Sequence, residues 1–506
     1  MRGLAIFLLV LIAAPARGAE AGGLDAALAS RVFAAALDFV APRSLDPFTM
    51  AELSGWGLRG IAALDPALSA AVAGGQVQLS NAMGVIYSRP VPPEANGQAA
   101  AAGWGEALAG VVQAAALASE AVRRASTEEV LQSVFDEMFN HLDPYTRYVA
   151  PVAANADRAR RNGEAGAGLT LAQGDGGIVI RAVNANGSGA DAGLRAGDRL
   201  LSVDGRPTQG QPAAQVEDWV SGDEGTSVTL VVRGERGGVR RVRVERVVTP
   251  PETVFASRLG DLLLLRVAFF AEDTDGRIAA ELARAVRGPR PVRGAILDLR
   301  ANRGGQLRQA VAASVMMLGS GVVVTTAGRD PQASRIWRGE GADLLAGRPL
   351  VVLVDGRSAS AAEIMAAALA DRGRAVVAGS VSYGKGLVQA VTAMPDGGEL
   401  FVSWSRLIAP DGWPLQGLGV MPQVCTSLGG TALREQLDAL GTGRDVLGPA
   451  LARTRAARPP LPEAEAVEMR QACPAAVGRD EDLDAARWLL AHPEAYRAAL
   501  LPGAMR

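Results

Sequence analysis

Residues 349–372 read PLVVLVDGRSASAAEIMAAALADR, which is an apolar strand, a glycine-containing turn and an alanine-rich helix in direct succession. The same order occurs upstream, where a strand-like run at 292–299 precedes a glycine turn and a helical pattern over 306–318. Strand, tight turn and helix in repeated alternation predict an α/β core with several parallel strand pairs. We assign this core to residues 252–430.

Ser360 stands where the turn of this stretch meets its helix. A helix N-terminus presents free backbone N–H groups and the positive end of the helix dipole to whatever binds there. Ser360 is therefore the candidate nucleophile. The N–H of Ala361 is a candidate donor to a developing oxyanion, and the upstream turn offers Gly304 and Gly305 as the source of a second donor.

A serine nucleophile needs a base, and histidine is poorly supplied because His141 and His492 both lie outside the core strands. Lys and Arg together number 51, and Lys385 is the only lysine. Arg cannot be deprotonated in a protein, whereas burial can lower the pKa of an amine until it acts as a base. Lys385 lies between two glycines, and Gln389, four residues on, falls on the same face of a strand and nearly the same face of a helix. We therefore predict a Ser360–Lys385 dyad, with Gln389 holding the amine.

Residues 160–250 differ from this core, since short β-type runs alternate with Gly and Asp turns. The order of these runs, with GAGL at 166–169, AGLRAGD at 192–198 and LSVDG at 201–205, resembles a PDZ domain. PDZ domains bind a protein C-terminus as an added strand and receive its carboxylate on backbone N–H groups. By that resemblance the carboxylate loop consists of Gly166, Ala167, Gly168 and Leu169. The alternative is a small β-domain that only packs against its neighbour.

The two ends of the chain carry no chemical signature. Residues 20–150 form an Ala- and Leu-rich helical N-terminal region, and residues 431–506 form a helical, Pro-punctuated C-terminal extension. Residues 1–19 combine Arg2, an apolar run of about eleven residues and small residues near Ala19, which indicates a signal peptide and export to the periplasm. An uncleaved anchor is the alternative, although the run is short for a membrane span.

The bulk composition excludes several partners. The net charge is −2, which argues against a nucleic-acid partner. The two cysteines and two histidines lack ligand spacing, so we expect no metal and no cofactor. Cys425 and Cys473 either pair in an oxidising compartment or remain buried thiols. No segment after the signal reaches membrane length, so stable membrane insertion is not expected.

Several motifs in one order resemble the carboxyl-terminal processing peptidases, or tail-specific proteases, over about residues 130–425. They are LDPY at 142–145, the PDZ unit, DLRANRGG at 298–305, SASAAE at 358–363, GKGLVQ at 384–389 and GLGVMP at 417–422. The resemblance implies that Ser360 is the nucleophile, with Lys385 and Gln389 matching the family lysine and glutamine. It also implies a multidomain α/β protein whose core resembles the crotonase-like fold. The chain departs from the family pattern at Arg303, where Pro is usual, and at Ala362, where Ser is usual.

We therefore expect an exported serine endopeptidase that binds accessible C-termini of proteins or peptides, with homo-oligomerisation left open. The alternative is a catalytically silent scaffold that binds C-termini, and an amidase or esterase is a more distant reading. Two neighbours of the nucleophile also have expected roles. Glu363 either hydrogen-bonds within the site or complements the helix dipole, and Ser358 is expected to cap the helix that Ser360 opens and not to react.

Overall fold

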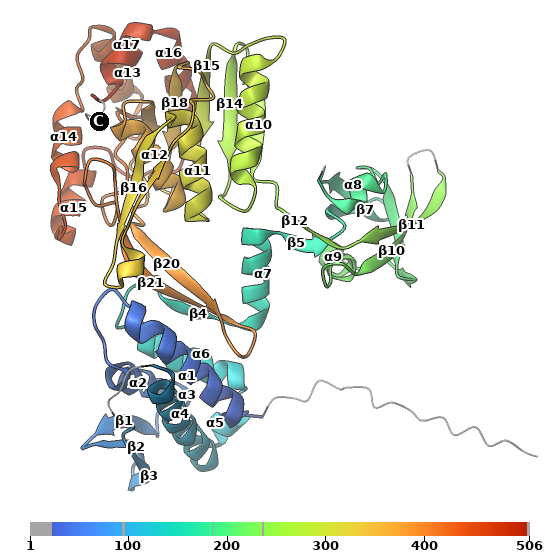
Figure 1. The fold of residues 1–506 in the computed structure, drawn as a ribbon, viewed down its shortest axis with the longest axis vertical. Coiled ribbons are helices and arrows are strands. Elements are labelled where there is room, and N and C mark those ends of the chain that lie inside the picture. Colours follow the sequence, from blue (N-terminus) through green and yellow to red (C-terminus); the bar gives the residue numbers. More distant parts are fainter. Residues whose placement is uncertain (1–22, 94–96, 185, 235–236, 503–506) are drawn as a thin grey trace, which may run out of the picture. The chain divides into compact units, whose positions relative to one another are not determined.

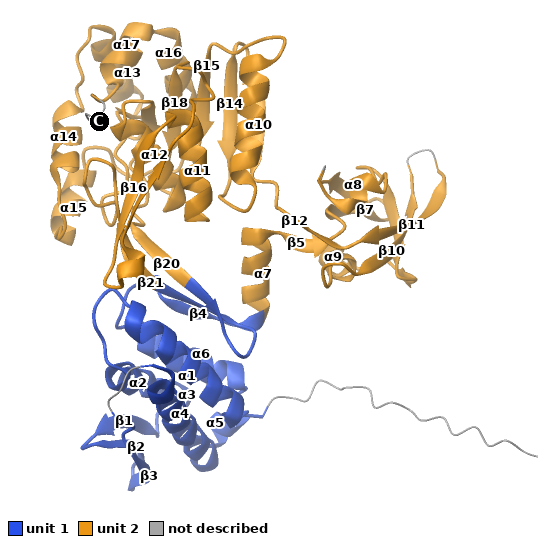
Figure 2. Cartoon of the chain, viewed as in Figure 1, with its two compact units in different colours: residues 1–151, 391–402 blue, residues 152–390, 403–506 orange. Residues whose placement is uncertain are grey.

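The computed structural model describes residues 23–93, 97–184, 186–234 and 237–502. They divide into two compact units (Figure 2). The first unit runs to Pro151 and includes Val391–Val402, and the second comprises Val152–Ala390 and the chain from Ser403 onward. The predicted signal at residues 1–19 lies outside the described residues.

The first unit combines helices with a small sheet that the sequence analysis missed. Its largest cluster of buried side chains includes Phe33, Leu53, Val112 and Phe135. Strands β1, β2 and β3 pair in an antiparallel sheet, so the prediction of a wholly helical region is wrong over this stretch. The elements are α1 (Ala26–Arg43), α2 (Met50–Leu58), α3 (Ile61–Leu64), β1 (Ser69–Ala73), β2 (Gln76–Asn81), β3 (Gly84–Pro90), α4 (Gln98–Ala118), α5 (Glu120–Arg124), α6 (Thr127–Phe139) and β4 (Arg147–Val149).

In the second unit, α7 (Pro151–Asn162) precedes a β-rich domain. Its sheet has the order β11-β10-β8-β7-β6, with β9 paired to β8, so β6 is an edge strand. The short β-type runs expected in this region are present, among them β7, β8 and β10. The elements are β5 (Glu164–Gly166), β6 (Leu169–Gly174), β7 (Gly177–Val183), α8 (Ser188–Asp191), β8 (Arg199–Val203), β9 (Arg206–Pro207), α9 (Ala213–Val220), β10 (Ser227–Arg233), β11 (Val239–Glu245) and β12 (Val247–Thr249).

The α/β core is built on a six-stranded sheet of order β13-β14-β15-β18-β19-β22. Figure 1 labels β14, β15 and β18 of this sheet. Strands β14 to β22 pair in parallel, and β13 is antiparallel to β14. The strands are β13 (Val254–Leu259), β14 (Leu262–Val267), β15 (Gly294–Asp298), β18 (Leu350–Val354), β19 (Val376–Gly379) and β22 (Val424–Cys425). The helices that follow β14, β15 and β18 are α10 (Thr274–Arg287), α11 (Leu307–Leu318) and α12 (Ala361–Asp371). The parallel pairings predicted from the repeated strand–turn–helix order are confirmed.

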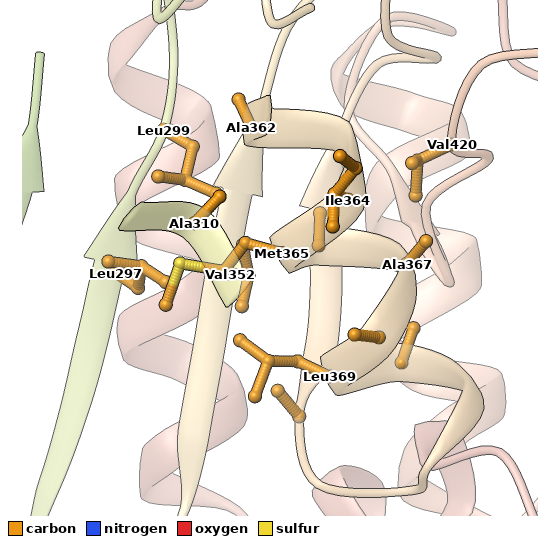
Figure 3. Close-up of a cluster of buried hydrophobic side chains, with 14 of the residues drawn as sticks. Leu297, Leu299, Ala310, Val352, Ala362, Ile364, Met365, Ala367, Leu369 and Val420 are labelled. Carbon is orange, nitrogen blue, oxygen red and sulfur yellow. The ribbon is translucent and has the colours of Figure 1, made fainter. Parts of the chain in front are cut away.

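The sheet is buried on both faces because alternate side chains of each strand point to opposite sides. Leu297 and Val352 join the cluster that contains α11 and α12, as Figure 3 shows for the side chains around Met365. Ile296 and Val351 join a second cluster on the other face. That second cluster is completed by residues from beyond position 430.

The C-terminal residues therefore form one face of the core instead of a peripheral tail. The hydroxyl of Tyr496 accepts a hydrogen bond of 3.0 Å from the N–H of Leu350 in β18. Cys425 and Cys473 form a disulfide, which settles the question left open by the sequence. The helices of this region are α13 (Gly430–Gly441), α14 (Gly448–Ala456), α15 (Glu463–Arg470), α16 (Asp480–Ala491) and α17 (Pro493–Ala499).

A separate sheet has the order β17-β16-β21-β20, and β4 pairs with β21. Its strands are β16 (Gly321–Ala327), β17 (Arg335–Gly339), β20 (Leu387–Ala393) and β21 (Glu399–Ile408), with the short helix η1 (Pro331–Ala333) between the first two. Over the described part of the chain, no helix combines the length and the apolar character needed to traverse a bilayer.

Candidate active site

Ser360 lies in a strained turn between β18 and α12. Its φ is +55° and its ψ is −114°, a backbone conformation that costs free energy for a residue with a side chain. Its N–H donates to Oε2 of Glu363 at 2.7 Å. Ser358 does not cap α12, because its hydroxyl donates to the carbonyl of Leu299 at 2.8 Å and accepts from the N–H of Asp355 at 2.9 Å. Strain in residues at a ligand-facing turn is typical of functional sites.

Asp355 stabilises this turn through hydrogen bonds to its carboxylate. Its carboxylate accepts backbone N–H groups from Ala301 at 2.9 Å, Arg357 at 3.0 Å and Gly478 at 3.0 Å. Burial acts to raise the pKa of Asp355, but these donors outweigh burial and the pKa is lowered. The carboxylate is therefore ionised and joins three separate segments, of which the last, near Gly478, comes from the C-terminal region.

Two more hydrogen bonds attach the C-terminal segment near Gly478 to the core. The N–H of Gly356 donates to the carbonyl of Ala476 at 2.8 Å, and the hydroxyl of Ser380 donates to the same carbonyl at 3.0 Å. The disulfide of Cys473 lies a few residues before these contacts. Residues 473–478 thus form part of the support of the serine turn.

The upstream turn lies directly against the serine. The N–H of Ala359 donates to the carbonyl of Asn302 at 2.9 Å, and the buried side chain of Asn302 bonds the carbonyl of Val267 at 2.8 Å. A Cβ added to Gly304 would come within 2.9 Å of the Ser360 Cβ, and Gly304 has a φ of +101°. Only glycine fits there without displacing the nucleophile.

The three candidate oxyanion donors differ in their present use. The N–H of Gly304 donates to Oδ1 of Asn302 at 2.8 Å and is therefore occupied. The N–H groups of Gly305 and Ala361 have no hydrogen-bond partner among the residues that the structure describes. Gly305 and Ala361 are thus the two candidates whose N–H groups remain available as donors.

Lys385 lies in the loop between β19 and β20 and is partly buried. Its Nζ donates to Oε1 of Gln389 at 3.1 Å, so the predicted hydrogen bond between these two side chains is present. Its backbone N–H donates to Oε2 of Glu363 at 2.9 Å.

Glu363 connects the serine turn to the lysine loop. Its side chain is fully buried, and its Oε2 accepts both the N–H of Ser360 and the N–H of Lys385. The backbone nitrogens of Ser360 and Lys385 therefore lie no farther apart than the sum of these two hydrogen-bond lengths, 2.7 Å and 2.9 Å. Oε1 accepts the hydroxyl of Ser382 and the N–H of Gly384, the latter at 2.7 Å. Burial raises the pKa of Glu363, and the four donors oppose that rise.

The β-rich domain contains a groove of about 700 Å³. It is lined by the predicted carboxylate loop (Gly166 to Leu169), by the edge strand β6 and by Glu217 and Val220 of α9. An edge strand beside a groove can accept an extended peptide as an additional strand. This is the arrangement that C-terminus binding requires.

Comparison with known proteins agrees with both parts of this description. Residues 261–426 match Peptidase family S41, and residues 179–234 match the PDZ domain. The carboxy-terminal-processing protease of Bartonella bacilliformis is 30% identical over 304 residues, covering 59% of this chain and 69% of that protein. The chloroplastic C-terminal processing peptidase of Tetradesmus obliquus is 31% identical over 324 residues, covering 60% and 68%.

This chain belongs to the carboxy-terminal processing protease family. The resemblance seen in the sequence motifs is thereby confirmed, and the family is one of serine peptidases. A solved structure of a photosystem II D1 C-terminal processing protease is 28% identical and covers 57% of this chain and 81% of that one, with a TM-score of 0.35. Because this score is low, family membership rests on the sequence relatives.

Each of the two histidines of this carboxy-terminal processing protease stacks on a tryptophan. His141 stacks on Trp56 with 4.7 Å between ring centroids and lies 3.7 Å from Glu137. His492 stacks on Trp488 at 4.1 Å, and its Nδ1 lies 2.8 Å from the carbonyl oxygen of the same residue. Among the described residues, no group of three or more His, Cys, Asp or Glu side chains is arranged to hold a metal ion.

Sequence reasoning missed the residues that align this carboxy-terminal processing protease's site. Glu363 had two open roles, and the structure shows that it bonds the lysine loop as well as the helix start. Asp355 was not singled out, and Asn302 was named only as part of a motif, with no role of its own. Asp298 and Arg300 form an ion pair, with 2.8 Å between Oδ2 and Nη2. The sequence shows these positions only as polar residues near the end of a strand or the start of a helix, and this does not indicate which groups they bond.

Proposed function

We propose that this carboxy-terminal processing protease is an exported endopeptidase that hydrolyses peptide bonds with a Ser360–Lys385 dyad. The observation that carries the proposal is the shared acceptor Oε2 of Glu363, which ties the backbone of the serine turn to that of the lysine loop. The hydrogen bond from Lys385 to Gln389 supports it further, since it orients the amine.

The reaction follows from these roles. With its amine uncharged, Lys385 takes the proton of the Ser360 hydroxyl as the oxygen attacks the scissile carbonyl. The tetrahedral oxyanion is stabilised by the N–H groups of Gly305 and Ala361. Lys385 then returns the proton to the leaving amine, which departs and leaves an acyl ester on Ser360. Water, deprotonated by Lys385, hydrolyses that ester and restores the hydroxyl.

Substrate capture belongs to the PDZ domain in this proposal. The loop of Gly166, Ala167, Gly168 and Leu169 receives the terminal carboxylate, and the peptide adds to the free edge of β6. The core carries the crotonase-like fold, a proposal supported by the parallel sheet whose strands β15 and β18 each lead through a turn into a helix.

Export is proposed from residues 1–19, and it places the enzyme in the periplasm. The disulfide between Cys425 and Cys473 supports an oxidising compartment, because such bonds are rare in the cytosol.

Replacing the base tests the dyad. We expect Lys385→Arg to lower the rate of cleavage of a disordered protein by about 1000-fold, since Arg keeps the charge but cannot act as a base. Ser360→Ala should be equally inactive, and Arg453→Ala, which changes an exposed ion pair with Glu468, should cleave normally. Equal cleavage by all variants would exclude the dyad, and absence of cleavage even by the unaltered protein would favour a silent C-terminus-binding scaffold.

A further inference from the structure

The edge strand of the PDZ groove carries one backbone N–H that is already occupied. The N–H of Leu171 in β6 donates to Oε1 of Glu217, which lies on α9, at 2.8 Å. Both residues line the groove. A carboxylate of the domain itself therefore occupies a hydrogen-bonding position that an added strand would use.

The alternating direction of the N–H groups along β6 determines the register in which a peptide strand would add to it. N–H groups that face the free edge recur at every second residue of a strand. The pairing of β6 with β7 shifts between Thr170 and Leu171, but the extra residue, Arg181, belongs to β7, so the N–H groups of Leu169 and Leu171 still point to the same edge. If the terminal carboxylate lies on the loop that ends at Leu169, an antiparallel peptide places its last residue opposite Leu169. The residue two positions earlier then lies opposite Leu171.

The side chain of that earlier residue faces α9. Leu171 is buried with Val216 and Val220, so its own side chain points to the face of the sheet that α9 covers. Residues directly opposite each other in an antiparallel pair project to the same face. The third-last side chain of the peptide is therefore directed towards Glu217.

Binding of the peptide removes the partner of the Glu217 carboxylate, because a peptide carbonyl takes the N–H of Leu171. A carboxylate that loses its donor in a groove gains most from a charged donor. The other charged residues that line the groove are Arg160, Arg181, Glu164 and Glu252. Glu217 differs from all four in that it bonds the edge strand itself.

We propose that Glu217 occupies the empty groove and selects C-termini that carry a basic side chain two residues before the last. A Lys or Arg there replaces the lost hydrogen bond by a charge-assisted one, and an Asp or Glu there is repelled. The inference rests on the proposed capture of C-termini by the PDZ domain, and it adds the chemical class of peptide that this domain prefers.

Short peptides that differ only in the third-last residue test this preference. They carry Lys, Gln or Glu there, and each binds to the full chain with Ser360→Ala, which prevents cleavage, in a fluorescence anisotropy titration. We expect the Lys peptide to bind about fivefold more tightly than the Gln peptide, with the Glu peptide weakest. An amidated Lys peptide serves as the control for recognition of the terminal carboxylate.

Two variants on one helix isolate the charge. Glu217→Gln keeps an acceptor for the Leu171 N–H but loses the charge, so its affinities for the Lys and Glu peptides should converge. Asp218→Asn removes the same charge from the neighbouring exposed position, which does not line the groove, and should keep the preference. Thermal unfolding of both variants verifies that the domain is folded.

The outcomes separate this inference from the function on which it rests. Equal affinity for the Lys and Glu peptides, or a preference that survives Glu217→Gln, overturns the role of Glu217 and leaves capture of C-termini intact. If no peptide with a free carboxylate binds, or if the amidated peptide binds equally well, capture of C-termini by the PDZ domain is refuted. The proposed role of Glu217 is then refuted with it.

Discussion

Replacement of Glu363 by Gln is the change that most directly tests how the active site is held together. The carboxylate accepts four hydrogen bonds, and three of the donors are backbone N–H groups of Ser360, Gly384 and Lys385. An amide keeps one oxygen and replaces the other by an NH₂ group, which cannot accept. At least one donor must therefore lose its acceptor.

The best arrangement of the amide sets the size of the effect. If its oxygen takes the position of Oε2, the N–H groups of Ser360 and Lys385 keep their acceptor, and the hydroxyl of Ser382 can turn to accept from the NH₂ group. The N–H of Gly384 has no such freedom and is left unpaired in a buried place. That costs about 1–3 kcal/mol in the free energy of unfolding of the core. It also displaces the lysine loop, and a shift of about 1 Å lowers kcat by about 100-fold.

Two measurements follow these effects separately. Urea unfolding monitored by circular dichroism gives the loss of stability, and steady-state cleavage of a disordered protein gives kcat and KM. The matched control is Glu129→Gln, because Glu129 also accepts the N–H of its N-cap residue, Ser126, at 2.7 Å but is exposed and bonds no other loop. We expect little change in either quantity for the control.

The reasoning is refuted if Glu363→Gln keeps the kcat and the stability of Glu129→Gln. A rise in KM with unchanged kcat would also contradict it, since Glu363 contacts the catalytic turns and not the PDZ groove.

Three further changes have defined outcomes. Gly304→Ala should reduce kcat by about 100-fold, because the new Cβ would lie 2.9 Å from the carbonyl oxygen of Ala359, whereas Gly430→Ala, with open space around it, should be neutral in the same assay. Asp355→Asn should destabilise the core by about 2 kcal/mol at neutral pH. Because the pKa of Asp355 lies below its usual 3.8, its contribution is present above that pH and is lost as pH falls through the native pKa, so unfolding curves of the two proteins should approach each other in acid. Cys473→Ser should lower the free energy of unfolding by about 4 kcal/mol from the chain-entropy relation at a separation of 48 residues, and a variant as stable as the parent in urea would contradict this.

Much of the core was predictable because its signals are local. The strand before Ser360, the turn and the helix after it are all contained in 24 consecutive residues, which read 349–372. The bond from Lys385 to Gln389 joins residues only four apart, so it lay within reach of a sequence argument, although Lys385 lies in a loop and not on the expected strand. The family motifs also predicted the order of the PDZ domain and the core along the chain.

The rest depends on contacts that are distant in sequence. Glu363 bonds residues 19 to 22 positions away, and Asp355 bonds Gly478, 123 positions away, so neither partner could be read from spacing. Strands β1 to β3 were missed because their segment is rich in Ala, Gln and Ser, which carry little β-propensity. The sheet forms there because Val77 and Leu79 are buried within the first unit.

The support that residues 473–478 give to the serine turn bears on when the enzyme becomes active. A growing chain contains Ser360 and Lys385 long before it contains the groups that bond Asp355 and Gly356 from the far end. We therefore expect the nucleophile to be misaligned on a nascent chain and to be set in place only after these late residues have folded back. The order of synthesis would then delay proteolysis without the need for a removable inhibitory segment.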